Sequence, residues 1–413
     1  SIVLVEAIYR VAAIAFGLGV VGSTLLSAIR TFVLPRNENA FLSSFVFIVI
    51  WRVMRFALRR MRRFEAQDRL LAYLSPIGLL ALPVFWLFLI VLGYTGLYFG
   101  VAGDLTWRQA FILSGSSLMT LGYSFVDEIP LIVLSFSQAA LGMMLIALLI
   151  GYLPTMYSAY SNREKMVIKL EIRAGTPPSA VEMIKRLHLF GVLEDGADFK
   201  ALFYEWEDWF IELEENHTTL SPLNFYRSHV STRSWLTAAG VVLDAASLTA
   251  SCIDLPHASY AGATVRAGYV AINNIAEFFG YHHDYHKTRE DPISITREEF
   301  DAAYDALAQV DLPLYADREA CWQNYRGWRV NYDSALLLMT TFIFAPRVAW
   351  VSDRHPVDLP PGFEHMDTWK DLRAPEAALE FSYNDLSEQA QQQAVATRRG
   401  RAGSGQEPDQ AAS

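Results

Sequence analysis

Uncharged apolar runs dominate the first 163 residues of the chain. Residues 11–29 form a run of 19 residues without a charge, and residues 70–103 and 129–162 are each 34 residues without one. A straight helix needs ~20 apolar residues to cross a bilayer, so the longer runs can tilt or project beyond it. The shorter stretch 40–58 completes a span if its arginines snorkel to the membrane surface. The pattern predicts an integral membrane protein with four transmembrane helices.

A different pattern begins at Lys165, where apolar and polar residues alternate with the period of amphipathic helices. Thr176-Pro177-Pro178 predicts the start of a first helix that ends near Gly191. Thr296 with Glu299 has the spacing of a capping box. Further helices are expected at 199–215, 232–253, 258–284, 297–310 and 317–344. Alternating strand patterns and repeats are absent from the sequence, so an all-α bundle is expected from about 176 to 350.

Two of these segments, 232–253 and 258–281, are apolar enough to suggest another membrane hairpin. Asp244, Arg266 and Glu277 interrupt them, and a central Asp or Arg costs about 2.5–3.5 kcal/mol on insertion scales. Buried core helices of the bundle are therefore the expected structure.

Charge separates the two halves of the chain. Residues 1–163 carry a net charge of +5 and the remaining 250 carry −15, although charged residues are only 19% of the chain. The acidic half lacks the clustered basic face of a nucleic-acid-binding domain, so no nucleic-acid partner is expected. Two cysteines, Cys252 and Cys321, are too few for a disulfide framework and indicate a reducing compartment.

Orientation follows from the basic loops. Residues 51–69 carry seven arginines and are predicted to be cytoplasmic. Residues 104–128 then lie outside, and the acidic half and both termini of this multi-pass cell-membrane protein lie in the cytoplasm. A voltage sensor would need a four-helix bundle before the pore, so the arginines at 52, 55, 59 and 62 are interpreted as a stripe that binds anionic lipid. Glu6 and Arg10 are one helical turn apart and can pair.

The loop between the two long runs, residues 104–128, is polar and serine-rich but contains an apolar segment at 110–118. A short helix that begins near Trp107 and dips into the membrane, followed by non-helical backbone, explains both properties. Such backbone is tolerated at membrane depth only where it is buried in protein or lines a water-filled cavity. The loop therefore indicates a channel.

Thr120-Leu121-Gly122-Tyr123-Ser124 resembles the selectivity-filter signature of potassium channels, usually Thr-Val-Gly-Tyr-Gly. The resemblance implies that Thr120 binds the ion through its hydroxyl and carbonyl, and that the carbonyls of Leu121, Gly122 and Tyr123 replace the hydration shell of potassium. It also implies that the Tyr123 ring contacts the pore helix. Gly122 fits a position that needs positive φ. One pore loop cannot surround an ion, so a homotetramer is implied, with K⁺ as the permeant ion and no cofactor.

The loop also departs from that family. Ser124 replaces the second glycine, where a side chain resists positive φ. Phe125 occupies the usual aspartate position, and Ser116 lies near the place of the usual pore-helix glutamate. Asp127 and Glu128 come later and would form a carboxylate ring at the outer mouth, unless they simply mark the end of a span. A degenerate or non-selective pore is one alternative to a potassium channel. Gly122-Tyr123 also fits an ordinary reverse turn, in which case the resemblance is coincidental.

The second long run carries two features that are typical of a gating helix. Gly142 lies 20 residues beyond Gly122, where such channels often have a hinge, although a small residue also allows close helix contact. Pro154 follows Gly151 and can kink the cytoplasmic end, because proline removes a helical hydrogen bond.

The predicted organisation is an all-α membrane protein in four parts. Residues 1–69 form two transmembrane helices and a basic loop, and 70–163 form a potassium-channel-like pore module. Residues 164–386 form a cytoplasmic helical domain that regulates or assembles the pore, and 387–413 form a disordered tail.

Other functional classes have little support in the sequence. His282, His283, Asp284 and His286 form the one metal-like cluster, but a polar helix end gives the same pattern and no metal site is expected. Catalytic motifs are absent, so an enzyme is not expected. The alternative to a potassium channel is a membrane-anchored signalling or scaffold protein with a degenerate or non-selective cation pore. The sequence does not identify a regulatory ligand.

Overall fold

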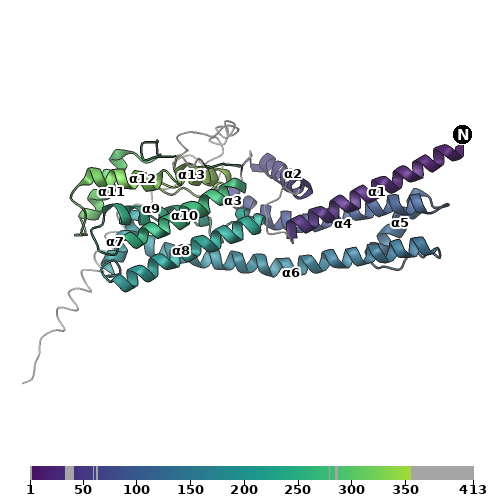
Figure 1. The fold of residues 1–413 in the computed structure, drawn as a ribbon, viewed down its shortest axis with the longest axis horizontal. Coiled ribbons are helices and arrows are strands. Elements are labelled where there is room, and N and C mark those ends of the chain that lie inside the picture. The colour runs from purple at the N-terminus through teal and green to yellow at the C-terminus, as the bar shows by residue number, and fades with distance from the viewer. Residues whose placement is uncertain are drawn as a thin grey trace, which may run out of the picture. The chain divides into compact units, whose positions relative to one another are not determined.

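A computed structural model describes residues 2–32, 41–58, 60–61, 64–278, 280–283 and 287–354 of the chain (Figure 1). Within these ranges the protein is mostly helical and has no strand, as the sequence predicts. The helices are α1 (Ile2–Phe32), α2 (Phe41–Leu58), α3 (Phe64–Ala72), α4 (Leu74–Val101), α5 (Trp107–Leu118), α6 (Ile129–Ala174), α7 (Ala180–Leu189), α8 (Gly196–Thr219), the 3₁₀ helix η1 (Ser221–Phe225), α9 (Trp235–Cys252), α10 (Ser259–Phe278), α11 (Arg297–Ala308), α12 (Arg318–Arg329) and α13 (Asp333–Phe342).

Four helical stretches of the described chain are long and apolar enough to cross a membrane. They are Leu4–Phe32, Ala66–Val101, Ile129–Ala174 and Trp235–Cys252. The first three coincide with the predicted spans at 11–29, 70–103 and 129–162. The fourth is α9, whose most apolar window is 94% buried inside the protein. A helix enclosed by other helices on every side is a core helix, as predicted for 232–253.

Helices α1 and α4 make an unusually close antiparallel contact. A Cβ atom added at Gly96 would lie 2.8 Å from the Ala13 carbonyl oxygen, and one at Gly93 would lie 3.1 Å from that of Gly17. Small residues allow this approach of two backbones, which is how helices associate in membranes without a hydrophobic driving force. Gly93 and Gly96 therefore allow the backbones of α1 and α4 to pack closely.

Arg10 fixes one end of this helix pair. Its guanidinium pairs with Glu6 at 2.9 Å, which confirms the predicted ion pair. It also donates hydrogen bonds to the carbonyl oxygens of Phe99 (3.3 Å), Ala102 and Gly103 (2.7 Å) at the end of α4. These carbonyls have no partner within the helix, and a cation there also complements the helix dipole.

The contacts of α1 determine its direction. Arg10 lies at the C-terminal end of α4, and at the other end of α1 the Phe32 ring lies 4.6 Å from that of Tyr152 in α6. If α1, α4 and α6 all cross a membrane, α1 begins on the side of residues 104–128 and ends on the side of the bundle. An N-terminus on the same side as the acidic half would require residues 40–58 to cross as well.

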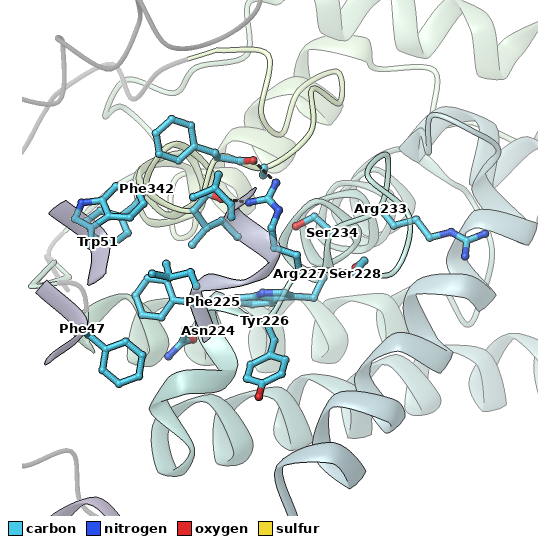
Figure 2. Close-up of a pocket in the computed structure, with 16 residues that line it drawn as sticks. Phe47, Trp51, Asn224, Phe225, Tyr226, Arg227, Ser228, Arg233, Ser234 and Phe342 are labelled. Atoms are coloured by element: carbon cyan, nitrogen blue, oxygen red, sulfur yellow. Dashed lines mark hydrogen bonds between the residues drawn. The ribbon is translucent and has the colours of Figure 1, made fainter. Parts of the chain in front are cut away.

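Helix α2 contacts both the start of α4 and the bundle. The Phe47 ring lies against Gly78 near the start of α4, Trp51 lies 6.1 Å from Phe344, and Leu58 belongs to the bundle core. These contacts place α2 beside the first part of α4 and the bundle, where Phe47 and Trp51 line a cavity (Figure 2). Within the described residues α2 is not among the four stretches long and apolar enough to cross a membrane, so the predicted span at 40–58 and the predicted side of the N-terminus stay predictions. Of the arginines predicted to bind lipid, Arg59 and Arg62 lie outside the described residues.

Helix α6 continues from the loop at 104–128 into the bundle without a break (Figure 1). It crosses the predicted domain boundary at 163–164 and ends at Ala174, and its C-cap residue Gly175 has a φ of 86°. The predicted helix start at Thr176 is therefore wrong. The next helix, α7, begins three residues later, where Ser179 accepts a hydrogen bond from the Glu182 amide.

Arg163 joins α6 to the bundle. It is the first charge after the 34-residue uncharged run, and it is 3% exposed. Its guanidinium pairs with Glu164 at 2.9 Å and donates to the carbonyls of Leu223 (3.1 Å) and Tyr226 (2.8 Å). His217 of α8 lies 3.4 Å from it through Nε2. The end of the uncharged run is thus bonded directly to α8 and η1.

The other bundle helices follow the sequence prediction with two corrections. The capping box of Thr296 and Glu299 is present at the start of α11. The predicted helix at 258–284 ends at Phe278, and the predicted helix at 317–344 is divided into α12 and α13. The division has a physical reason, because the turn between them lets Arg329 and Tyr332 both reach Asp244 of α9. The predicted tail, 387–413, and residues 355–386 lie outside the described residues.

Candidate functional site

The loop that resembles a potassium-channel filter follows α5, which begins at Trp107 as the sequence predicts. Thr106 accepts a hydrogen bond from the Gln109 amide, and the Gln109 side chain accepts one from the Thr106 amide. This capping box satisfies amide groups at the helix start. The Trp107 ring stacks on Phe99 of α4 at 4.2 Å. The short helix that the sequence predicts near Trp107 is therefore present, and its first turn is fixed to α4.

A buried hydrogen-bond network connects α4, α5 and α6 behind the loop. Gln138 of α6 is fully buried; it donates to the Ser114 hydroxyl at 2.7 Å and accepts from Tyr98 at 3.1 Å. The Ser117 and Ser135 hydroxyls lie 2.8 Å apart. Each of these groups is expensive to bury without a partner, so the network fixes how the three helices meet. Sequence analysis missed it, although a glutamine inside an uncharged apolar run is a usable signal.

Gly142 lies where α6 passes the end of α5. A Cβ atom there would lie 2.8 Å from the backbone carbonyl oxygen of Leu118. The glycine thus allows close contact between α6 and the end of α5, which was one of its two predicted roles; a hinge at this position remains a prediction. Gly151 has no atom within 4 Å of such a Cβ, and α6 stays helical through Pro154.

The backbone amides after α5 are bonded back to that helix. The amides of Thr120 and Leu121 donate to the carbonyls of Ser117 (3.2 Å) and Ser116 (2.9 Å). The Ser116 hydroxyl then accepts two further hydrogen bonds, from the amides of Tyr123 (2.8 Å) and Ser124 (3.2 Å). Ser116, near the place of the family's pore-helix glutamate, is therefore the side chain that holds the loop.

The backbone carbonyl oxygens of residues 120–124 differ from the amides of this loop. Across the described ranges, no donor makes a hydrogen bond to the carbonyl oxygens of residues 120–124. Gly122 has the positive φ that the resemblance implies, 65°, and Thr120 has a φ of 53°. A β-branched residue rarely adopts this conformation, which costs of order 1–3 kcal/mol. The left-handed positions are thus Thr120 and Gly122, and Ser124 avoids that strain.

The loop side chains point into open space in the single chain. Leu121, Tyr123 and Phe125 are 71%, 79% and 87% exposed. The expected contact of the Tyr123 ring with the pore helix is therefore not made within one chain. Asp127 and Glu128 are exposed at the start of α6, and Glu128 occupies its N-cap position without a side-chain cap.

The described residues include no group of three or more His, Cys, Asp or Glu side chains that could hold a metal ion. Of the predicted histidine cluster, Asp284 and His286 lie outside the described residues. Comparisons of the chain with models of protein families, with curated proteins and with solved structures gave no match.

Proposed function

We propose that the chain is one subunit of a cation channel that conducts potassium, and that residues 120–124 line its narrowest part. One observation carries the proposal. The amides of this segment are held by α5 through Ser116 and Ser117, while its carbonyl oxygens accept no hydrogen bond from the described residues.

This division suits ion conduction for a physical reason. A cation that enters a narrow pore loses water ligands, and carbonyl oxygens can replace them. The carbonyls must stay in place without an ion, so their peptide groups need another anchor, and the amide bonds to α5 supply it. The C-terminal end of α5 also faces this segment, and its partial negative charge favours a cation.

A closed pore requires several copies of the chain. A single loop presents carbonyls from one side only, and its exposed apolar side chains at 121, 123 and 125 need cover. A ring of four copies, as the resemblance implies, would provide both. Contact with membrane lipid is the corresponding role of the exposed apolar residues of α1 and α6.

The test is ion flux into liposomes that contain only this protein, with potassium compared against sodium. Potassium flux above that of empty liposomes is expected, and its absence would contradict the proposal. Ser116→Ala should lower the flux or the preference for potassium, because the amides of Tyr123 and Ser124 lose their acceptor. Ser23→Ala is the matched control, since the Ser23 hydroxyl bonds only within α1, to the Val20 carbonyl. Thr120→Ala should alter block by barium without preventing assembly.

A second candidate function is a membrane-anchored signalling or scaffold protein with a non-selective pore. It is supported by the backbone at Thr120, which is left-handed in this chain whereas Ser124, in place of the family's second glycine, is not. Equal potassium and sodium fluxes would favour this alternative, and Thr120→Ala would then leave the flux ratio unchanged.

A further inference from the structure

The two cysteines of the chain lie beside each other in the bundle, although α10 and α11 separate them in the sequence. Cys252 is the last residue of α9, and Cys321 is in the first turns of α12. Tyr315 contacts both: its amide donates to the Cys252 carbonyl at 2.9 Å, and its carbonyl oxygen lies 3.9 Å from Cys321 Sγ. The two thiols also interact directly with each other. Both are free and reduced, so the fold holds a dithiol at this place.

The two thiols differ in how readily they ionise. A hydrogen bond with Cys321, and then burial, raise the pKa of Cys252 well above its usual value, so Cys252 stays protonated and is the donor. Cys321 accepts this bond, which lowers its pKa. Its place near the start of α12 also favours a negative charge, because helix N-termini stabilise thiolates. The thiolate is the nucleophile in thiol oxidation, so Cys321 is the more reactive of the two.

An exposed stretch of chain lies against both cysteines. Residues 313 and 315–317 are exposed, although the thiols themselves are buried. Two backbone hydrogen bonds hold this stretch to the end of α9, from the Tyr315 amide to Cys252 and from the Asp254 amide to the Pro313 carbonyl at 2.8 Å. Segments with few such bonds open locally without global unfolding. A small oxidant can therefore reach the dithiol when this stretch opens.

We propose that Cys252 and Cys321 form a reversible disulfide when the protein meets hydrogen peroxide, which makes the bundle sensitive to oxidation. The Cys321 sulfur attacks one peroxide oxygen, the O–O bond breaks, and a sulfenic acid forms as the first water molecule leaves. The Cys252 sulfur then attacks the sulfenic sulfur. The S–S bond forms, the S–O bond breaks, and the Cys252 proton leaves with the hydroxyl group as the second water molecule. Two thiols thus give two electrons to one peroxide.

The disulfide would join the end of α9 covalently to the start of α12. In a reducing compartment, disulfides of this kind are transient and sense redox conditions rather than stabilise the fold permanently. The dithiol lies within the bundle, at α9 and α12, so this modification does not depend on whether the pore conducts.

The test treats the reduced full chain, in detergent micelles, with excess hydrogen peroxide. The protein is then unfolded, its free thiols are alkylated, and the products are identified by peptide mass spectrometry. The two free thiols per chain should fall to none, with one peptide pair joined through Cys252 and Cys321. Dithiothreitol should restore both thiols. The chain should remain monomeric on a non-reducing denaturing gel, because the bond forms within one chain.

Two single variants test the order of the steps. Cys252→Ser keeps a donor beside Cys321, and its sulfenic acid should persist and be labelled by dimedone. Cys321→Ser leaves only the thiol whose pKa is raised, so dimedone labelling should be at least about tenfold lower, because one pKa unit changes the thiolate fraction tenfold. Circular dichroism verifies that each variant is folded, and the peptide map of the parent decides the matter if one is not.

Four outcomes would overturn the proposal. They are two thiols that stay free after peroxide treatment, a disulfide between chains instead of within one, oxidation of a single cysteine to a sulfinic acid without a disulfide, and stronger dimedone labelling of Cys321→Ser than of Cys252→Ser.

Discussion

Arg329 is expected to be the most important charged residue for the stability of the bundle. It is completely buried, and its guanidinium lies 2.6 Å from Asp244 and 2.6 Å from Asp333. Burial acts to lower the pKa of Arg329, but the two carboxylates overcome this and hold the pKa well above its usual value. The side chain is therefore charged at every pH at which the protein is folded.

The substitution Arg329→Met would leave two buried carboxylates without a cation. Removing one partner of a buried ion pair typically costs about 3–5 kcal/mol. Neutral donors remain: Tyr325 (3.2 Å) and Tyr332 (2.8 Å) bond Asp244, and the Ser294 amide (3.0 Å) and hydroxyl (2.6 Å) bond Asp333. Because these donors still stabilise the two carboxylates, the expected loss of unfolding free energy is near the lower end of that range, about 3 kcal/mol. For a domain of this size, that corresponds to a fall of roughly 6–12 °C in Tm.

Thermal unfolding of the full chain in detergent, followed by circular dichroism, measures this difference. Arg318→Met is the matched control, because Arg318 is 37% exposed and pairs with Asp305 at the surface. Exposed pairs contribute about 0–1 kcal/mol, so this variant should stay close to the parent. Adding Asp244→Asn to Arg329→Met should recover part of the loss by removing one unpaired charge. Equal Tm values for Arg329→Met and Arg318→Met would refute the reasoning.

Three further predictions concern other parts of the chain. Burial, and then a neighbouring arginine, holds the pKa of His217 well below 6.5; the unfolded chain therefore binds a proton that the folded chain does not, and stability should fall by about 1.4 kcal/mol per pH unit below pH 6.5. His217→Gln should make unfolding measurably less sensitive to pH between 6.5 and 5. Gly142→Ala should destabilise the protein by about 1–3 kcal/mol because the new Cβ meets a backbone carbonyl, whereas Gly151→Ala should stabilise it by about 0.5–1 kcal/mol because glycine disfavours a helix interior. Asp127→Asn with Glu128→Gln should lower single-channel potassium current at low salt, with the loss shrinking as salt screens the ring; equal currents would make them ordinary boundary residues.

Local signals in the sequence predicted the parts of the fold that depend on neighbours along the chain. The uncharged runs located α1, α4 and α6, and the start of α5 at Trp107 followed from the apolar segment that succeeds it. The capping box at Thr296 was likewise confirmed. These features are set within a few helical turns, so the order of the residues is sufficient to find them.

Long-range contacts explain what the sequence did not predict. The apolar pattern of 40–58 gave no sign that Trp51 and Leu58 contact the bundle. Within the candidate site, the φ of Gly122 was predictable from its residue type, whereas that of Thr120 was not. The loop is held by Ser116, whose hydroxyl reaches amides seven and eight residues later. A cavity whose wall includes Phe47, Trp235 and Ala345 was not predictable either, because these residues are far apart along the chain.

The unbroken course of α6 has a mechanical consequence. Ile129, next to the loop at 104–128, and Arg163, which is bonded into the bundle, are 34 residues apart along the helix, or about 50 Å at 1.5 Å per residue. Because Arg163 is held by Glu164 and by the carbonyls of Leu223 and Tyr226, a rigid helix would rotate about this residue. If the helix stays rigid, a tilt of roughly 5° at Arg163 would displace Ile129 by about 4 Å. Small rearrangements among α8, η1 and Arg163 are thus amplified at the opposite end of the helix, beside residues 120–124.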